Sequence, residues 1–133
     1  PAADERVMYY RRLAAAVTVE DAERIVTDMR TAHGALPEPA ANMCTRARLK
    51  ALASEIGAES VLQTGGKVVI KPVRNQLKAA AMGKESRAVL ERLRAIYFTK
   101  SEKYSVPVAK GESPLEVALE VLNALYRVAE DNR

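Results

Sequence analysis

Apolar residues recur at helical spacing through the N-terminal part of the chain. This spacing predicts three helices: 4–16, a second between Thr18 and Gly34, and a third at about 38–56. The residues expected to face the core are Val7, Tyr10, Leu13 and Ala14 in the first helix, Ala22, Ile25, Val26 and Met29 in the second, and Met43, Ala47, Leu49, Leu52, Ala53 and Ile56 in the third.

Two glycines and one capping pattern set the boundaries of these helices. Thr18 is followed three residues later by Asp21, which resembles a capping box, in which each side chain satisfies a free N–H of the first turn. Gly34 and Gly57 lie just past the second and third helices. A left-handed residue is expected at both positions, because a missing Cβ makes that conformation accessible.

A helical corner joins the second helix to the third. Pro37 and Pro39 cannot continue the helix that ends before Gly34. They fit the first turn of a new helix, which has no use for the N–H that proline lacks. We therefore expect a fixed bend within residues 23–57, around which the other elements are arranged.

The C-terminal half of the chain begins with a hairpin signal. Gly65-Gly66 lies between two β-rich runs, and both positions of a two-residue turn need positive φ. Pro72 marks an edge or an end of the strand before it, and Pro107 likewise indicates an edge strand. The expected strands are 60–64, 67–73, 96–99 and 104–108.

Two further helical regions complete the pattern. Residues 75–96 are predicted to be helical in two parts broken at Gly83, and Ser113-Pro114 opens a last helix that continues to about Ala129. The inner face of the broken helix is predicted to be Val89, Leu90, Leu93 and Ile96. More than half of the last helix is apolar, so it is expected in the middle of the domain or against a neighbour. The fold class that follows is α+β, with helices packed on a small, mostly antiparallel sheet of three or four strands.

Composition supports one folded domain over residues 1–133. Hydrophobic residues make up 48% of the chain, and no apolar run is long enough to span a bilayer, so no membrane contact is expected. The single cysteine, Cys44, excludes an internal disulfide and suits a reducing cytoplasm. Because the chain starts at Pro1 without Met, we expect it to be a fragment of a longer protein.

Positive charge is concentrated in the middle of the chain. The segment from Lys67 to Lys110 carries eleven Lys or Arg against three Glu, a net +8, whereas residues 111–133 carry two Arg against five acids, a net −3. A solvated basic surface is the simpler interpretation. The alternative is a nucleic-acid-binding module on this basic segment. Its candidate residues, which equally fit a core edge, are Tyr97, Phe98, Lys100, Lys103 and Tyr104.

No combination of residues predicts a catalytic or metal centre. His33 and Cys44 are single, whereas a structural zinc site needs four such ligands. Cys44 is expected to be a small buried hydrophobe. Gly83-Lys84 resembles the end of a phosphate-binding loop, but Lys78 stands where that loop needs glycine and Glu85 where it needs Ser or Thr.

The corner and the helix after it carry a sequence signature. Gly34-Ala-Leu-Pro-Glu-Pro39 is followed by Asn42, by Arg46-Ala-Arg-Leu-Lys-Ala-Leu-Ala53 and by Ile56-Gly57. This combination resembles the C-terminal domain of bacterial transcription-repair coupling factors, in which a G-x-L-P-x-P turn leads into an N-L-x-x-x-A-R-L-x-x-x-A-x-x-L-G helix. The corner and the A-R-L helix are the specific part, and the order of the other elements is compatible.

The resemblance implies a function in transcription-coupled nucleotide excision repair of DNA damage. The whole protein would be a translocase on double-stranded DNA that uses ATP and Mg, dislodges stalled RNA polymerase and recruits the repair protein UvrA. The present domain would hold no ATPase and no cofactor. It would instead pack on the UvrB-like N-terminal module of the same chain and mask the UvrA-binding surface, which is an autoinhibitory role.

The resemblance also implies where the interdomain contact lies. In the family it comes from the end of the helix before the corner, with the pattern E-L-x-D-R-F-G. Asp28 stands here at the Glu position, but Thr31-Ala-His33 replaces Asp-Arg-Phe. The contact thereby loses a carboxylate and a guanidinium that could make charge-assisted hydrogen bonds. The residues expected at the interface are Asp28, Arg24, Thr31 and His33.

Overall fold

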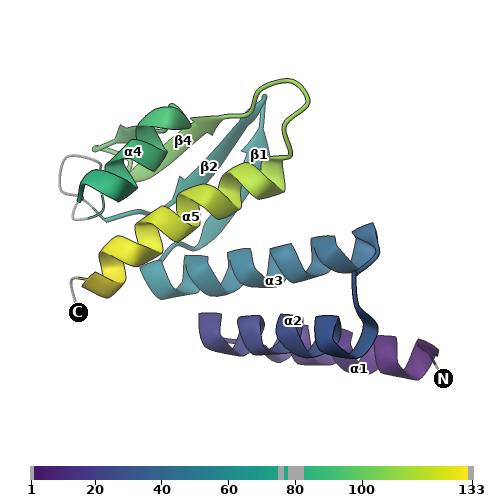
Figure 1. Ribbon diagram of the computed structural model, residues 1–133. Helices are drawn as coiled ribbons and strands as arrows, with labels where there is room; N and C mark the ends of the chain where they lie inside the picture. The colour runs from purple at the N-terminus through teal and green to yellow at the C-terminus, as the bar shows by residue number, and fades with distance from the viewer. Residues whose placement is uncertain (1, 75–76, 78–82, 132–133) are drawn as a thin grey trace.

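The computed structural model of the chain describes residues 2–74, 77 and 83–131 (Figure 1). Its elements are α1 (Ala2–Ala15), α2 (Val19–His33), α3 (Glu38–Ile56), β1 (Ser60–Thr64), β2 (Lys67–Lys71), α4 (Lys84–Arg92), β3 (Ile96–Phe98), β4 (Lys103–Pro107) and α5 (Pro114–Asp131). The strands form one antiparallel sheet in the order β1-β2-β4-β3. The predicted α+β class is confirmed.

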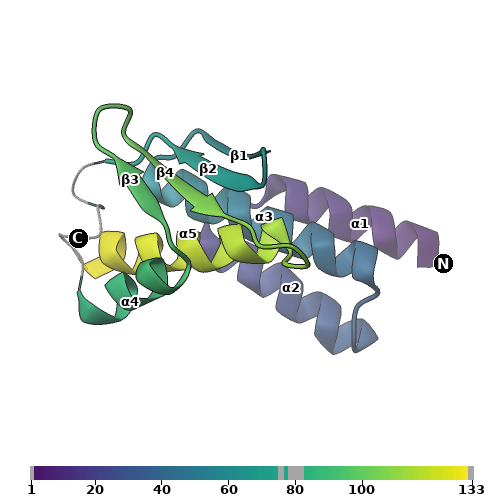
Figure 2. The same ribbon diagram turned by 90° about the horizontal axis from the view of Figure 1, so that it is seen from above.

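The helices lie on one side of the sheet (Figures 1 and 2). α5 runs beneath the sheet, α3 packs along α5, and α2 packs on the far side of α3 with α1 beside it. Figure 2 shows the sheet from above, and no helix of the described part covers its opposite face. The order of layers is therefore sheet, α5, α3 and then the pair of N-terminal helices.

α2 has the predicted bounds, and one half of the predicted capping box forms at its start, whereas the Asp21 carboxylate lies near Arg24. The Asp21 N–H donates to Thr18 Oγ1 at 3.0 Å, which caps the first turn, and Glu20 and Asp21 lie where the helix dipole favours carboxylates. The apolar stripe faces α1 and α3. Its buried residues are the four predicted ones, Ala22, Ile25, Val26 and Met29.

Both C-terminal glycines have positive φ, but only one adopts the left-handed helical conformation that the sequence predicts. Gly57 has φ 80° and ψ 14°, as expected. Gly34 has φ 72° and ψ −143°, which lies in the mirror image of the extended region and not in the left-handed helical one. Its N–H still closes α2 on the Arg30 carbonyl at 2.8 Å. The chain therefore leaves α2 in an extended course toward Pro37, which precedes α3.

α1 buries a different stripe from the one predicted. Tyr9 and Ala16 are buried together with Leu13, and they pack on α2 and α3. The rest of the predicted stripe is exposed or partly exposed: Val7, Tyr10 and Ala14. α1 has apolar residues on two adjacent stripes, so the sequence does not determine which stripe faces the core. Packing against α2 and α3 determines it.

α3 has the predicted bounds but buries more than one face. Its predicted residues Met43 and Ala47 are only partly buried, whereas Cys44 and Ala51 are buried among residues of α1 and α2. The other predicted residues, Leu49, Leu52, Ala53 and Ile56, are buried against the sheet and α5. α3 therefore joins two hydrophobic clusters.

The hairpin is confirmed. Gly65 and Gly66 have φ of 54° and 75°, as a two-residue turn between β1 and β2 requires. β2 ends at Lys71, directly before Pro72, so this proline marks the end of a strand.

The prediction that Pro107 marks an edge strand is wrong, because β4 lies between β2 and β3. Pro107 is the last residue of β4, opposite Lys67. β3 begins at Ile96, opposite Ser105, and so does not extend as far as Pro107. On that side of β4 no hydrogen bond to a neighbouring strand is lost when Pro107 lacks its N–H. An inner strand tolerates proline there.

The broken helix is confirmed in its second part. α4 begins at Lys84, directly after Gly83, and buries Leu90; the predicted first part, within 75–82, lies outside the described residues except for Leu77. Val89 and Leu93 are partly buried. Ile96 was wrongly assigned to the inner face of this helix: it starts β3 and is exposed.

α5 lies at the centre of the larger cluster, as its wide apolar surface predicts. The Glu116 N–H donates to Ser113 Oγ at 3.4 Å, and Pro114 is the first helical residue. α3, α4 and β2 all contact this helix. Its buried residues are Val117, Ala118, Val121, Leu122, Ala124, Leu125 and Val128.

Candidate interaction surfaces

The predicted interface residues lie on the exposed side of α2, before the corner. Arg24, Asp28 and Thr31 are exposed and share one helical stripe by their spacing. His33 lies off that stripe and contacts α1 instead. The structure thus brings three of the four predicted residues together. Arg24 Nη1 lies 3.6 Å from Asp21 Oδ1, within α2 itself.

One ion pair and one imidazole–carboxylate contact connect this surface to α1. Arg12 Nη2 donates to Asp28 Oδ2 at 2.7 Å, and His33 Nε2 lies 3.3 Å from Glu5 Oε2. All four side chains are more than a third exposed, so each pair contributes at most about 1 kcal/mol. Arg12 is not among the residues that the sequence predicts at the interface. The sequence shows only that Arg12 is a basic residue in the last turn of α1. This position does not identify the acidic residue with which it pairs.

An open pocket of about 340 Å³ lies at the corner, between α1 and the start of α3. Leu36 and Pro37 line it on the side of the corner. The Tyr9 ring, also in its wall, lies edge-on to the imidazole of His33, with centroids 5.7 Å apart and an angle of 87° between the planes. This ring contact joins the end of α2 to α1.

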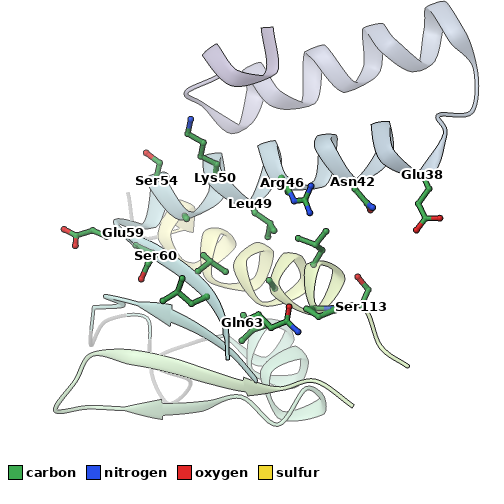
Figure 3. Close-up of a pocket in the computed structure, with 18 residues that line it drawn as sticks. Glu38, Asn42, Arg46, Leu49, Lys50, Ser54, Glu59, Ser60, Gln63 and Ser113 are labelled. Atoms are coloured by element: carbon green, nitrogen blue, oxygen red, sulfur yellow. The ribbon is translucent and has the colours of Figure 1, made fainter. Parts of the chain in front are cut away.

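A larger groove, of about 770 Å³, lies between α3 and the edge strand β1 (Figure 3). Its apolar walls include Leu49, Val61 and Leu115. Figure 3 shows Glu38 and Asn42 on the side of α3 that faces the groove. Among the described residues, no group of three or more His, Cys, Asp or Glu is placed to hold a metal ion.

Cys44 is a packing residue, as the sequence predicts. Its side chain is buried, and Sγ lies 3.8 Å from Met29 Sδ, between α3 and α2. Burial raises the pKa of the Cys44 thiol above its ordinary value of 9.0. The reactive thiolate is therefore disfavoured at neutral pH.

The aromatic residues of the basic segment do not form a nucleic-acid platform. Tyr104 is fully buried, and its hydroxyl donates to the Leu77 carbonyl. Tyr97 donates to the Val73 carbonyl at 2.6 Å, and burial, with a smaller effect of Glu102, raises its pKa. Phe98, beside Lys103, is the one exposed ring of the three, at 43%. Stacking on successive bases needs several exposed rings, so the nucleic-acid alternative is not favoured.

Among the described residues, no helix is both long enough and apolar enough to cross a bilayer.

Comparison with known proteins identifies a sequence family and a solved structure with a similar fold. The sequence profile of a family described as TRCF domain matches residues 1–82, more than half of the chain. A solved structure described as the crystal structure of the C-terminal domain of transcription-repair coupling factor superposes with a TM-score of 0.67 and 12% sequence identity. That superposition covers 98% of this chain and 84% of the other, and at such identity it shows a shared fold alone. A search of curated proteins found no match.

Proposed function

Because the chain belongs to the TRCF domain family of transcription-repair coupling factors, we propose that it is a regulatory, non-catalytic domain of such a factor. It packs on a UvrB-like N-terminal module of the same polypeptide and limits access of UvrA until repair begins. In this proposal the residues 1–133 form one C-terminal domain. The ATP- and Mg-dependent translocase, which engages double-stranded DNA and RNA polymerase, occupies other modules.

The exposed polar stripe of α2 beside the corner carries this proposal. Arg24, Asp28 and Thr31 face solvent on a helix whose other side is fully packed. Gly34 and Pro37 fix the direction of the chain directly after this stripe. A stripe on a rigid element loses little conformational entropy when a partner binds, which favours association.

Arg12 sets the strength of the proposed contact. Asp28 accepts a hydrogen bond from Arg12 but keeps 47% of its side chain exposed. A carboxylate has about four acceptor sites, so it can accept a second bond from a basic group of the partner. Arg12 also offsets part of the negative charge that this partner meets, and Thr31 adds a neutral hydroxyl. The contact is therefore weaker than one with a further carboxylate and guanidinium.

Isothermal titration calorimetry of this chain against the N-terminal UvrB-like module of the same polypeptide tests the packing. Saturable binding is expected, and Asp28→Ala should weaken it by about tenfold, which corresponds to about 1.4 kcal/mol. Glu59→Ala, which removes an exposed carboxylate next to β1, is the matched control and should leave binding unchanged. An absence of binding at high micromolar concentration, or equal losses in both variants, would discard the proposal.

A second measurement tests the masking of UvrA separately. In the full-length protein, Asp28→Ala should increase the amount of UvrA retained in a pull-down, because the module is released more often. UvrA binding equal to that of the unchanged protein would show that packing does not mask the UvrA site.

A further inference from the structure

The face of the sheet turned away from α5 has no helix of the described part over it (Figure 2). Directly opposed residues of antiparallel strands point to the same face. The strand register therefore aligns one row across all four strands: Leu62, Val69, Ser105 and Ile96. The buried face carries the alternate residues, such as Ile70 and Tyr104, which are inaccessible to solvent. We call the face that bears the row the outer sheet face.

The outer sheet face is unusually apolar for a surface. Leu62 is 52% exposed and Ile96 57% exposed, at the two ends of the row. Phe98 lies two residues beyond Ile96 on the same face and is 43% exposed. Single exposed apolar residues are common on proteins, but several on one flat face mark an interaction site.

Positive charge surrounds this row. Lys67 and Lys71 lie two residues before and after Val69 in β2, and Lys103 lies two residues before Ser105 in β4. The three lysines therefore point to the same face as the row. Lys103 Nζ lies 5.3 Å from the centre of the Phe98 ring. None of the strand residues on this face is Asp or Glu. A partner that complements this face therefore needs a surface that is apolar at its centre and acidic at its rim.

We propose that the outer sheet face binds an amphipathic helix of a protein partner, whose apolar stripe covers the row and whose Asp and Glu flanks pair with the lysines. A helix of about 18 residues is about 27 Å long, and four strands about 4.8 Å apart span about 14 Å, so a helix that lies along the row reaches all four strands. On the buried face of the same sheet, α5 is the helix that packs against it. The site is separate from the corner and does not depend on the function proposed there.

The same lysines would also attract a nucleic acid, but the centre of the face does not suit one. Bases bind to sheets by stacking on exposed aromatic rings. The row offers the aliphatic side chains of Leu62, Val69 and Ile96, and Phe98 is the single aromatic ring among the strand residues of this face. The rings of Tyr97 and Tyr104 point to the other face, where they pack 4.9 Å apart. The observations favour apolar side chains of a protein as the occupant.

Fluorescence anisotropy with the complete 133-residue chain tests this proposal. The probe is a labelled helical peptide of about 18 residues with Leu at helical spacing and Glu on both flanks. The comparison probes are the same peptide with Lys in place of each Glu, and a short single-stranded oligonucleotide. Only the Glu peptide should bind, and the backbone amide shifts that it causes in NMR spectra should lie in β1, β2, β3 and β4. Binding of the oligonucleotide instead, shifts confined to other elements, or no saturable binding would each overturn the proposal.

A matched pair of charge variants separates a specific contact from a general charge effect. Lys71→Glu with Lys103→Glu should weaken binding of the Glu peptide by at least about tenfold. Arg11→Glu with Lys84→Glu changes the net charge equally on α1 and α4, away from the face, and should have little effect. Equal weakening by both pairs would overturn the proposal. Thermal unfolding identifies a pair that fails to fold, in which case the corresponding Gln variants replace it.

Discussion

At the scale of single residues, the backbone of Gly34 determines the corner. A Cβ added at Gly34 or at Gly57 would meet no atom within 4 Å, so space is not the constraint. The constraint is conformational, and it differs between the two positions. Gly57 has the left-handed helical geometry that Asn also tolerates, whereas ψ of −143° places Gly34 in a region nearly restricted to glycine.

Substitutions at the two glycines should therefore differ in a predictable way. Gly34→Ala and Gly34→Asn should each lower the free energy of unfolding by about 1–3 kcal/mol, because both residues strain the backbone. Gly57→Asn should cost less than about 1 kcal/mol, because Asn can enter the left-handed region. Urea denaturation followed by circular dichroism measures all three variants. A neutral Gly34→Ala, or equal costs for Asn at both sites, would contradict this account of the corner.

At the scale of elements, the sequence predicts a segment well when local chemistry alone decides it. The cap at Thr18, the glycine after α3 and the two-residue turn at Gly65 each depend on neighbours in sequence, and each is found as predicted. The face that a helix buries depends on its partners when apolar residues occupy adjacent stripes. For that reason α1 turns Tyr9 inward and leaves Val7 exposed.

The candidate surfaces show the same division. The exposed stripe of α2 follows from helical spacing, so Arg24, Asp28 and Thr31 could be placed together from the sequence. The pairing of Arg12 with Asp28 requires the packing of α1 on α2, sixteen residues apart in the chain. The outer sheet face requires the strand order and the side that α5 covers, which no local pattern records.

The rotation of α1 gives a prediction at this scale. Leu13→Ala should lower the free energy of unfolding by about 2–4 kcal/mol, since it leaves a cavity between α1 and α2. Val7→Ala should change it by less than about 0.5 kcal/mol, because Val7 is 46% exposed. Chemical denaturation of both variants is the measurement. A larger loss from Val7→Ala than from Leu13→Ala would show that the helix buries the stripe first expected from the sequence.

At the scale of the whole molecule, two hydrophobic clusters share α3. One contains the buried residues of α1 and α2, and the other contains those of the sheet and α5. α1 contributes Tyr9 and Leu13 to the smaller cluster, with Ala16 directly after it, whereas α5 contributes seven buried residues to the larger one. An element that buries few side chains at the end of a chain opens at a lower free energy than the central core. α1 should therefore open while the sheet and α5 remain folded.

Hydrogen exchange of the backbone amides tests whether α1 opens before the rest of the chain. The test compares how a substitution in each cluster changes the exchange free energies of α1 and α5. Leu125 is fully buried in the larger cluster and stays packed when α1 alone opens. Leu125→Ala should thus lower the exchange free energy of α5 amides by about 2–5 kcal/mol and leave that of α1 amides unchanged. Leu13→Ala should lower the exchange free energy of the amides of both α1 and α5. The packing of Leu13 is lost when α1 opens alone and also when the whole chain unfolds, so this substitution makes both openings easier. If Leu125→Ala lowered the protection of α1 and α5 equally, the clusters would form one cooperative unit, and α1 could not be released on its own.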